Sequence, residues 1–295
     1  MHTATYYIDL LLSGITVGSL YALIAIGYTM VYGILRLINF AHGDIFMMAG
    51  FFMVYISASM PMAVAIPVVL IMTVALGLLI ERAAYKPLRS APRMSVMISA
   101  IGVSYLLQNL ATYITGGLAR PYPEIPFLKG TFMLGALKIK IITVVTPLLT
   151  VLLVIALVIF INHTKTGMAM RAVSRDFDTA RLMGIKVDNI ISVTFIIGSF
   201  LAGVGSILYF SNYGQVSPTI GAMPGLKAFV AAVFGGIGSI PGAVLGAYII
   251  GICESLIKAN DAIAIFSNAF TFALLILVLL FKPNGMFGEK LAEKV

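Results

Sequence analysis

Residues 141–161 read IITVVTPLLTVLLVIALVIFI, and residues 191–210 read ISVTFIIGSFLAGVGSILYF; neither stretch contains a charged residue. Between them, residues 162–190 read NHTKTGMAMRAVSRDFDTARLMGIKVDNI and carry eight charged side chains. About 20 consecutive apolar residues is the length that a helix needs to cross the hydrocarbon core of a bilayer. The pattern therefore predicts two membrane-spanning helices joined by a polar segment that lies outside the membrane.

The composition of the whole chain indicates the same class. Hydrophobic residues make up 60% of the chain and charged residues 10%, whereas a soluble domain carries about 25% charged residues. A transmembrane β-barrel would show segments of about ten residues with alternating apolar and polar side chains, and that pattern is absent. We therefore expect an all-α, polytopic integral membrane protein. Because Cys253 is the single cysteine, no intramolecular disulfide can form.

Apolar segments recur along the entire chain, so we expect residues 1–295 to form one transmembrane domain. The predicted spans are residues 9–35, 44–60, 62–82, 94–115, 141–161, 190–212, 226–240, 242–258 and 262–282. Residues 226–258 are too long for one ordinary span. Their centre reads GGIGSIPG, and such glycines and prolines favour two short helices around a bend. The expected number of spans is eight to ten, with nine as the best estimate.

The distribution of lysine and arginine predicts the orientation. Basic residues are enriched in the cytoplasmic loops of membrane proteins, so the net charge of +8 indicates topology rather than nucleic-acid binding. Residues 82–93, residues 165–186 and the tail with Lys282, Lys290 and Lys294 are expected in the cytoplasm. The N-terminus then lies outside and the C-terminus inside, which an odd number of spans satisfies. The loop at residues 120–140 carries four basic residues and is the one exception.

No catalytic or metal-binding motif is present. The three histidines, His2, His42 and His163, lack the spacing of metal ligands, and neither GxSxG nor HExxH occurs. The phosphate-binding pattern G-x-x-x-x-G-K-[ST] is also missing. We therefore expect that the chain is not an enzyme and binds no cofactor or metal. Any energy from ATP has to come from another subunit.

Polar residues inside the spans are candidates for a translocation path. They are Ser13, Thr16, Ser19, Tyr28, Asn39, Gln108 and Asn109; hydrogen bonding between helices is the alternative role for most of them. Asn39, His42 and Asp44 in the segment LRLINFAHGD are predicted at the cytoplasmic edge. They could relay protons, or Asp44 could stabilise the start of the next helix. Fully charged side chains buried in the membrane are expected to be nearly absent, with Glu81 and Glu254 towards helix ends.

Small residues spaced four apart predict close helix packing, because small side chains let backbones approach each other in lipid. The sets that share a helical face are Gly14, Gly18 and Ala22; Gly198, Ala202 and Ser206; and Gly238, Gly242 and Gly246. We interpret these sets as part of the scaffold.

The polar segment at residues 163–189 contains a short predicted helix. Ser174 or Asp176 can cap its start, and Gly184 can close its end. Phe177, Ala180 and Gly184 share one face, where the small pair Ala180 and Gly184 would let another protein approach closely. The alternative is a solvated loop that only fixes topology.

Three passages resemble the permeases of branched-chain amino-acid importers, the LivH-type family of ABC transporter permeases. They are GSLYALIAIGYTMVYGILRLINFAHGDIFMMAG (residues 18–50), TKTGMAMRAVSRDFDTARLMGI (164–185) and AFVAAVFGGIGSIPGAVLGA (228–247). The resemblance implies a helical permease bundle in a bacterial or archaeal cytoplasmic membrane. It also implies that residues 163–189 form a cytoplasmic coupling segment that contacts ATPase subunits. The residues that carry this docking motif are Arg171, Ala172, Ser174, Asp176, Ala180, Leu182 and Gly184.

The resemblance further implies a set of partners. They are two ATPase subunits that bind ATP and Mg²⁺, an external solute-binding protein and a second related permease, in a heterodimer or alternatively a homodimer. The implied solute is a branched-chain or similar small amino acid, with urea or short amides as alternatives within the family. A different class, an ion-coupled carrier or channel independent of ATPases, would use the polar set near Asn39 and Asp44 as its coupling site.

Overall fold

The computed structural model describes residues 2–89, 91–134, 137–282 and 285–287. The tail lysines Lys290 and Lys294 lie outside these residues. Within the described chain, seven helical segments are long and apolar enough to cross a membrane. Their helices are α1 (His2–Leu35), α3 (Met62–Ile80), α4 (Arg93–Thr115), α5 (Ile141–His163), α8 (Val187–Tyr213), α10 (Ile240–Lys258) and α11 (Ser267–Phe281). Two apolar helices are shorter, α2 (His42–Ser57) and α9 (Ala222–Gly235).

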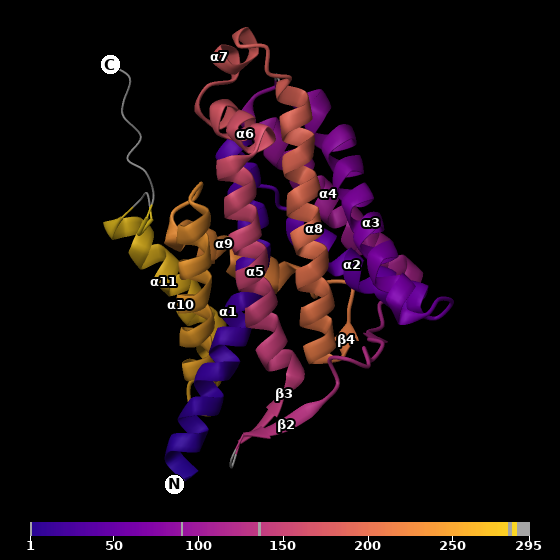
Figure 1. The fold of residues 1–295 in the computed structure, drawn as a ribbon, viewed down its shortest axis with the longest axis vertical. Helices are drawn as coiled ribbons and strands as arrows, with labels where there is room; N and C mark the ends of the chain where they lie inside the picture. The colour runs from indigo at the N-terminus through magenta and orange to yellow at the C-terminus, as the bar shows by residue number, and fades with distance from the viewer. Residues whose placement is uncertain (1, 90, 135–136, 283–284, 288–295) are drawn as a thin grey trace.

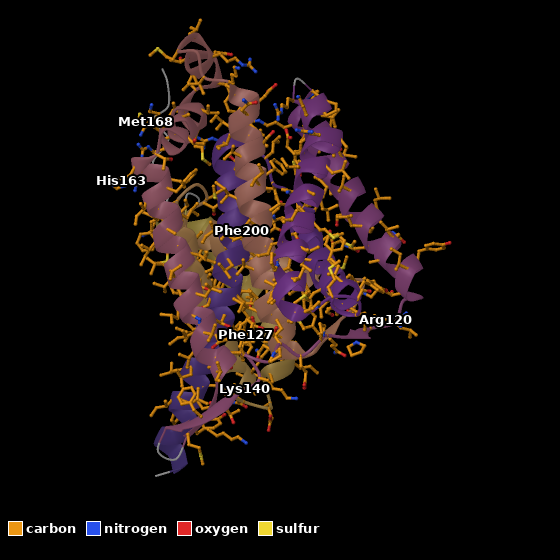
Figure 2. All side chains as sticks on the ribbon, turned by 45° about the vertical axis from the view of Figure 1, so that its right-hand side comes forward. Arg120, Phe127, Lys140, His163, Met168 and Phe200 are labelled. Atoms are coloured by element: carbon orange, nitrogen blue, oxygen red, sulfur yellow. The ribbon has the colours of Figure 1, made fainter. Side chains whose placement is uncertain are left out.

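The two ends of the bundle differ (Figure 1). One end, which we call the basic end, carries the short helices α6 (Lys165–Arg175) and α7 (Phe177–Leu182). The π-helical turn η1 (Glu81–Tyr85) and the 3-10 turn η2 (Lys86–Leu88) follow α3 at the same end. In Figure 2, His163 and Met168 lie towards the basic end, and Arg120 and Lys140 lie towards the other. The positive-inside rule makes the basic end cytoplasmic.

The opposite end holds the few strands and a short 3-10 turn. β1 (Arg120–Pro121) pairs antiparallel with β4 (Gln215–Val216), with Arg120 opposite Val216. β2 (Thr131–Leu134) and β3 (Leu137–Lys140) form an antiparallel pair, with Thr131 opposite Lys140. The turn η3 (Ala264–Phe266) precedes α11. Helix α1 begins at this end, where the Tyr6 hydroxyl donates to the Ala259 carbonyl at 3.2 Å.

Each predicted span overlaps one helix, but α2 and α9 are shorter than the seven helices that can cross a membrane by length. After α1 ends at the basic end, residues 36–41 run back into the bundle as non-helical chain, and α2 follows. After β4, residues 217–221 similarly lead into the bundle, and α9 continues to the basic end. Non-helical backbone at membrane depth is tolerated only where protein covers it. The packing of both segments inside the bundle meets this condition.

The order of elements repeats with inverted orientation in the described chain. A full helix, a non-helical re-entry, a short helix and two further full helices occur as α1 to α4 and again as α8 to α11. Helix α1 runs towards the basic end, whereas α8 starts there, so every corresponding helix points the opposite way. Membrane transporters commonly contain such inverted repeats, with interrupted helices close to the bilayer midplane.

Helix α1 lies at the centre of the bundle and packs against α10, α8, α9 and α5. A Cβ atom at Gly18 would lie 2.8 Å from the Cα of Tyr248, and one at Gly14 would lie 2.9 Å from the Cα of Ile252. The predicted small face of α1 therefore packs directly on the backbone of α10, as close packing in lipid requires. In contrast, Gly238 lies in the loop before α10 rather than on the helix face predicted for it.

Candidate functional site

Helix α6 is amphipathic and lies across the basic end. The Thr164 side chain caps it by accepting a hydrogen bond from the Gly167 N–H at 3.0 Å. Gly167, Met170 and Val173 are buried against the bundle, whereas Arg171 and Ala172 are exposed. The hydrophobic spacing thus fixes which face of this segment the rest of the protein covers.

Helix α7 begins at a cap formed by Asp176, one of the two capping residues predicted from the sequence. Asp176 Oδ1 accepts hydrogen bonds from the backbone N–H groups of Asp178 and Thr179, at 2.9 and 3.1 Å. A cap of this kind contributes about 1 kcal/mol to helix stability. Gly184 has φ 79°, and the backbone N–H of Ile185 donates to the Ala180 carbonyl at 3.0 Å. This left-handed closure favours glycine because a side chain is disfavoured at such a φ.

The outward surface of α7 differs from the predicted one. Ala180 is buried within its own subunit, with 3% of its surface exposed, so it cannot present the expected small face to another protein. Its burial accompanies the packing of α7 against α6 and α8. Leu182 and Met183 instead project from the tip, with 88% and 79% exposed. Met183 was not among the residues predicted from the sequence, although it stands next to Leu182 and before the closing Gly184.

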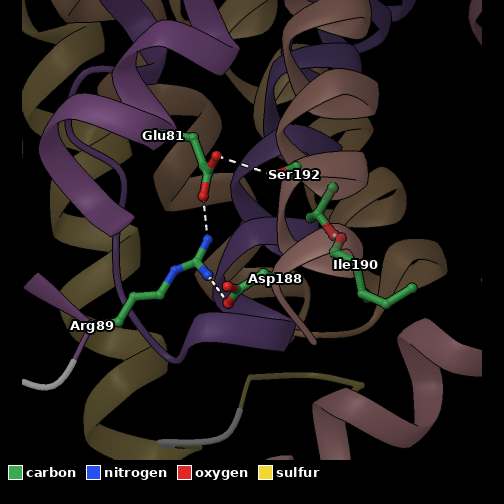
Figure 3. A network of polar contacts seen from close by, with 6 residues as sticks. Glu81, Arg89, Asp188, Ile190 and Ser192 are labelled. Carbon is green, nitrogen blue, oxygen red and sulfur yellow. Dashed lines mark hydrogen bonds and ion pairs between the residues drawn. The ribbon is translucent and has the colours of Figure 1, made fainter. Parts of the chain in front are cut away.

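An ion network joins the polar segment at residues 163–189 to the rest of the bundle (Figure 3). Arg89 pairs with Glu81 in η1 and with Asp188 in the first turn of α8. The Ser192 hydroxyl donates to the second oxygen of Glu81 at 3.1 Å. Glu81 is fully buried while Arg89 is 19% exposed. Because α8 follows α7 directly, the network connects the polar segment to α3 and η1.

A polar centre surrounds the start of α2. His42 lies against Gly27 of α1 and Gly198 of α8. Gly27 is eight residues before the end of α1, a rise of about 12 Å from the basic end. The predicted position of Asn39, His42 and Asp44 at the cytoplasmic edge is therefore wrong. The re-entry of residues 36–41 carries these side chains deep into the bundle instead.

Asp44 joins α2 to α4 rather than capping its own helix. Its carboxylate accepts hydrogen bonds from the Ser104 hydroxyl at 2.5 Å and from the Gln108 amide at 3.0 Å, and the start of α2 has no side-chain cap. Its place in the first turn still puts a negative charge near the positive end of the helix. No hydrogen bond joins His42 to Asp44 among the described residues, so the geometry gives no continuous proton relay there.

Two further predicted path residues lie at this centre. The Tyr85 hydroxyl donates to Asn39 Oδ1 at 2.8 Å, and the Tyr28 ring packs edge-on against His42 with centroids 4.9 Å apart. Asn39 Nδ2 and His42 Nε2 are buried without a hydrogen-bond partner in the described chain. Tyr28, Asn39 and Gln108 are therefore brought into one region.

The remaining four predicted path residues lie elsewhere. Thr16 and Ser19 donate along their own helix to Leu12 and Ile15, at 2.8 and 2.7 Å. Ser19 also donates to the Tyr248 hydroxyl at 3.1 Å. Ser13 and Asn109 are exposed on the outside of the bundle. Thr16 and Ser19 therefore make the contacts expected of hydrogen bonding within and between helices.

The start of α9 meets the start of α2. A Cβ atom at Gly43 would lie 2.7 Å from the Gly221 carbonyl oxygen and 3.2 Å from the Gly225 Cα. The first turns of the two short helices are thus in backbone contact near the middle of the bundle. Their positive ends are directed to the same region, which is the arrangement that interrupted transporter helices use to face anionic groups.

Buried full charges are more frequent than the sequence indicated. Lys227 of α9 pairs with Glu254 of α10 at 2.6 Å, and their side chains are 6% and 2% exposed. The Tyr21 hydroxyl donates to the other Glu254 oxygen at 2.8 Å. Lys258, which is half-exposed, approaches Glu254 at 2.6 Å. Sequence reasoning passed over Lys227 inside its apolar span, although a lone lysine there predicts a buried partner.

Comparison with known proteins gives the family of this chain. The family model described as branched-chain amino acid transport system / permease component matches residues 10–279. The high-affinity branched-chain amino acid transport system permease proteins LivH of Escherichia coli K12 and BraD of Pseudomonas aeruginosa are each 41% identical, over 98% of both chains. A probable LivH of Methanocaldococcus jannaschii is 28% identical over 92% of this chain and 89% of its own. The chain therefore belongs to the branched-chain amino acid transport permease family and is a multi-pass permease subunit of an ABC importer in the cytoplasmic membrane.

Proposed function

We propose that this subunit imports branched-chain or similar small amino acids that an external binding protein delivers. The observation that carries the proposal is the 41% identity to LivH and BraD across 98% of both chains, because the names of both relatives specify branched-chain amino acid transport. The polar centre supports it, since a small solute with two charged groups needs a few polar contacts in an otherwise apolar passage.

The polar centre offers complementary groups to an amino acid. Asp44 carries a carboxylate that would attract an ammonium group, and the paired starts of α2 and α9 would attract a carboxylate. Asn39 and His42 add buried polar atoms without a partner among the described residues. The backbone contact at Gly43 and Gly221 closes this region in the present conformation. Transport therefore requires α2 and α9 to separate, as alternating access between rigid units allows.

Helices α6 and α7 would couple this motion to ATP hydrolysis by partner subunits. The proposed contact residues are Arg171, Ala172, Ser174, Asp176, Leu182 and Gly184, with Ala180 acting through the packing of α7; to these we add Met183. Two ATPase subunits would bind ATP and Mg²⁺, and a second permease, related or identical, would complete the channel. The Arg89 network transmits movement of α7 to the bundle, because it ties the start of α8 to η1.

An uptake assay with the complete importer tests the solute. Cells expressing the chain with its cognate ATPase, permease and binding-protein subunits should accumulate labelled leucine, isoleucine or valine only while ATP is present. Excess unlabelled valine should compete, whereas urea and acetamide should not. Competition by urea or acetamide alone would move the assignment to short amides. Uptake that depends on an ion gradient, without the ATPases, would refute the proposal.

A matched pair of variants tests the docking surface. Leu182→Asp should reduce ATPase co-purification and uptake at least tenfold, because burial of one leucine side chain contributes about 1.5–3 kcal/mol. Leu118→Asp is the control, since Leu118 is 67% exposed and lies after α4 at the opposite end. Equal ATPase recovery with both variants would place the docking surface elsewhere.

A further inference from the structure

A cavity of about 640 Å³ opens at the basic end. Its walls come from the end of α1, the end of α5, helix α6, the loop before α10, and α11. The chain after α11 closes one side, where the backbone N–H of Phe287 donates to the Gly235 carbonyl at 3.0 Å. The cavity thus combines residues from Tyr32 to Phe287 of the chain, at the level where the bilayer meets the cytoplasm.

Three arginines line the cavity. Arg36 follows α1, and Arg171 and Arg175 come from α6. Arg36 and Arg171 are held towards the wall, since Arg36 Nη2 donates to the Ser174 carbonyl at 3.3 Å and Arg171 Nη1 donates to Asn162 Oδ1 at 2.7 Å. No Asp or Glu lines the cavity in the part of the chain that the structure describes. The cavity therefore concentrates positive charge without a lining counter-ion among the described residues.

The backbone at Arg36 is unusual. Arg36 has φ 55°, and it is the one non-glycine residue with positive φ within the described chain. A non-glycine residue in this region is destabilised by about 1 kcal/mol or more. Such strain persists where the surrounding structure requires the position, and here it directs an arginine into the cavity.

Two other features of the wall define the ligand. The start of α10 faces the cavity through Gly238, Ser239 and Ile240, and a helix start carries about half a positive charge. Val158, Leu279 and Phe287 form an apolar part of the wall. An anionic group beside an apolar chain satisfies both parts, and basic pockets between helices on the cytoplasmic side are suited to lipid headgroups.

We propose that this cavity binds the phosphate headgroup of an anionic phospholipid from the cytoplasmic leaflet. Arg36, Arg175 and the start of α10 hold the phosphate, and the apolar wall holds the upper part of an acyl chain. The site is separate from the polar centre, because Tyr28, Tyr32 and Phe229 line a void of only about 10 Å³ between them. A void of this size holds at most about one water molecule. The bound lipid bridges α1, α6 and α10. The proposal of a lipid site does not depend on which solute the protein transports.

Lipid retention measured by native mass spectrometry tests the proposal. The full chain is purified from membranes containing phosphatidylglycerol and phosphatidylethanolamine, and dissociation of added phosphatidylglycerol is followed. The double variant Arg36→Gln/Arg175→Gln should bind phosphatidylglycerol about thirtyfold more weakly, since each basic residue near the surface contributes a factor of about five. The matched control is Arg82→Gln/Lys86→Gln, which removes two exposed charges at the same end outside the cavity. The control should retain wild-type binding.

Further arms distinguish other occupants. Phe287→Ala should weaken phosphatidylglycerol binding without changing binding of inorganic phosphate, because only the lipid contacts the apolar wall. Displacement of the lipid by inorganic phosphate at equal concentration would identify a free-phosphate site and overturn the proposal. Equal loss of lipid in both double variants would reduce the effect to general surface charge, which also overturns it. If the double variant Arg36→Gln/Arg175→Gln retains lipid as the wild type does but loses amino-acid uptake, the cavity is part of the transport route. That result also overturns the lipid proposal.

Discussion

Substitution of Gly43 by alanine tests the contact between the two short helices. A Cβ atom at this position would lie 2.7 Å from the Gly221 carbonyl oxygen. Ordinary van der Waals contact begins at 3.4 Å, so the two backbones have to separate by about 0.7 Å, the difference between these two distances. The obstructing atom belongs to the backbone and has no rotamer that relieves the clash.

The expected cost of Gly43→Ala is about 1–3 kcal/mol, the usual range for overpacking a tight interior. Gly102→Ala is the matched control, because a Cβ atom there has no neighbour within 4 Å. Gly102 lies inside α4, where alanine is favoured over glycine by about 0.5–1 kcal/mol. The same chemical change should therefore destabilise the protein at one position and leave it unchanged or more stable at the other.

Thermal unfolding of the purified full chain in detergent is monitored by the monodisperse fraction on size exclusion. Uptake by the assembled importer is measured separately. Gly43→Ala should lower the unfolding temperature and reduce uptake, because the starts of α2 and α9 can no longer close on each other. An unfolding temperature and uptake rate equal to those of Gly102→Ala would refute the backbone contact. They would also refute the closed centre inferred from it.

Two charge networks give further predictions. Glu254→Gln should destabilise the protein by about 3–5 kcal/mol because Lys227 loses its buried partner. Lys227→Met should cost less because Lys258 still pairs with Glu254. A lower unfolding temperature for Lys227→Met than for Glu254→Gln would contradict this geometry. Arg89→Gln should destabilise the protein by a similar amount, about 3–5 kcal/mol, because buried Glu81 loses its charged partner. Arg89→Lys should restore only part of this stability, because an ammonium lacks the planar guanidinium that bridges two carboxylates. Arg82→Gln should stay within about 0.5 kcal/mol of the wild type, and equal losses for Arg82 and Arg89 would rule out a structural role for the network.

Local patterns predicted much of the polar segment. Asp176 and Gly184 mark the start and the closure of α7 because capping depends on residues only a few positions apart. The burial of Ala180 was not predictable in the same way. A helix of six residues has too little hydrophobic periodicity to reveal which side the bundle covers, and Ala180 fits either an inner or an outer face.

The polar centre shows where local reasoning stops. Asn39, His42 and Asp44 are polar enough to suggest a membrane edge, since exposed polar groups in lipid are costly. The structure satisfies part of this polarity with partners from other helices, namely Tyr85 for Asn39 and Ser104 and Gln108 for Asp44. These partners are 46 to 64 positions away, and no pattern in a single sequence indicates such pairings.

The amino-acid sequence by itself determined the membrane class, the apolar segments, the basic end and the position of the polar segment between α5 and α8. These properties depend on local composition, because transfer of a short stretch into lipid is governed by the residues within it. Only the tertiary structure decided that α2 and α9 meet in backbone contact, that Arg89 joins Glu81 to Asp188, and that three arginines share one cavity. Those features depend on which helices lie side by side, and helix pairing in lipid is decided by the fit of whole surfaces rather than by any one segment.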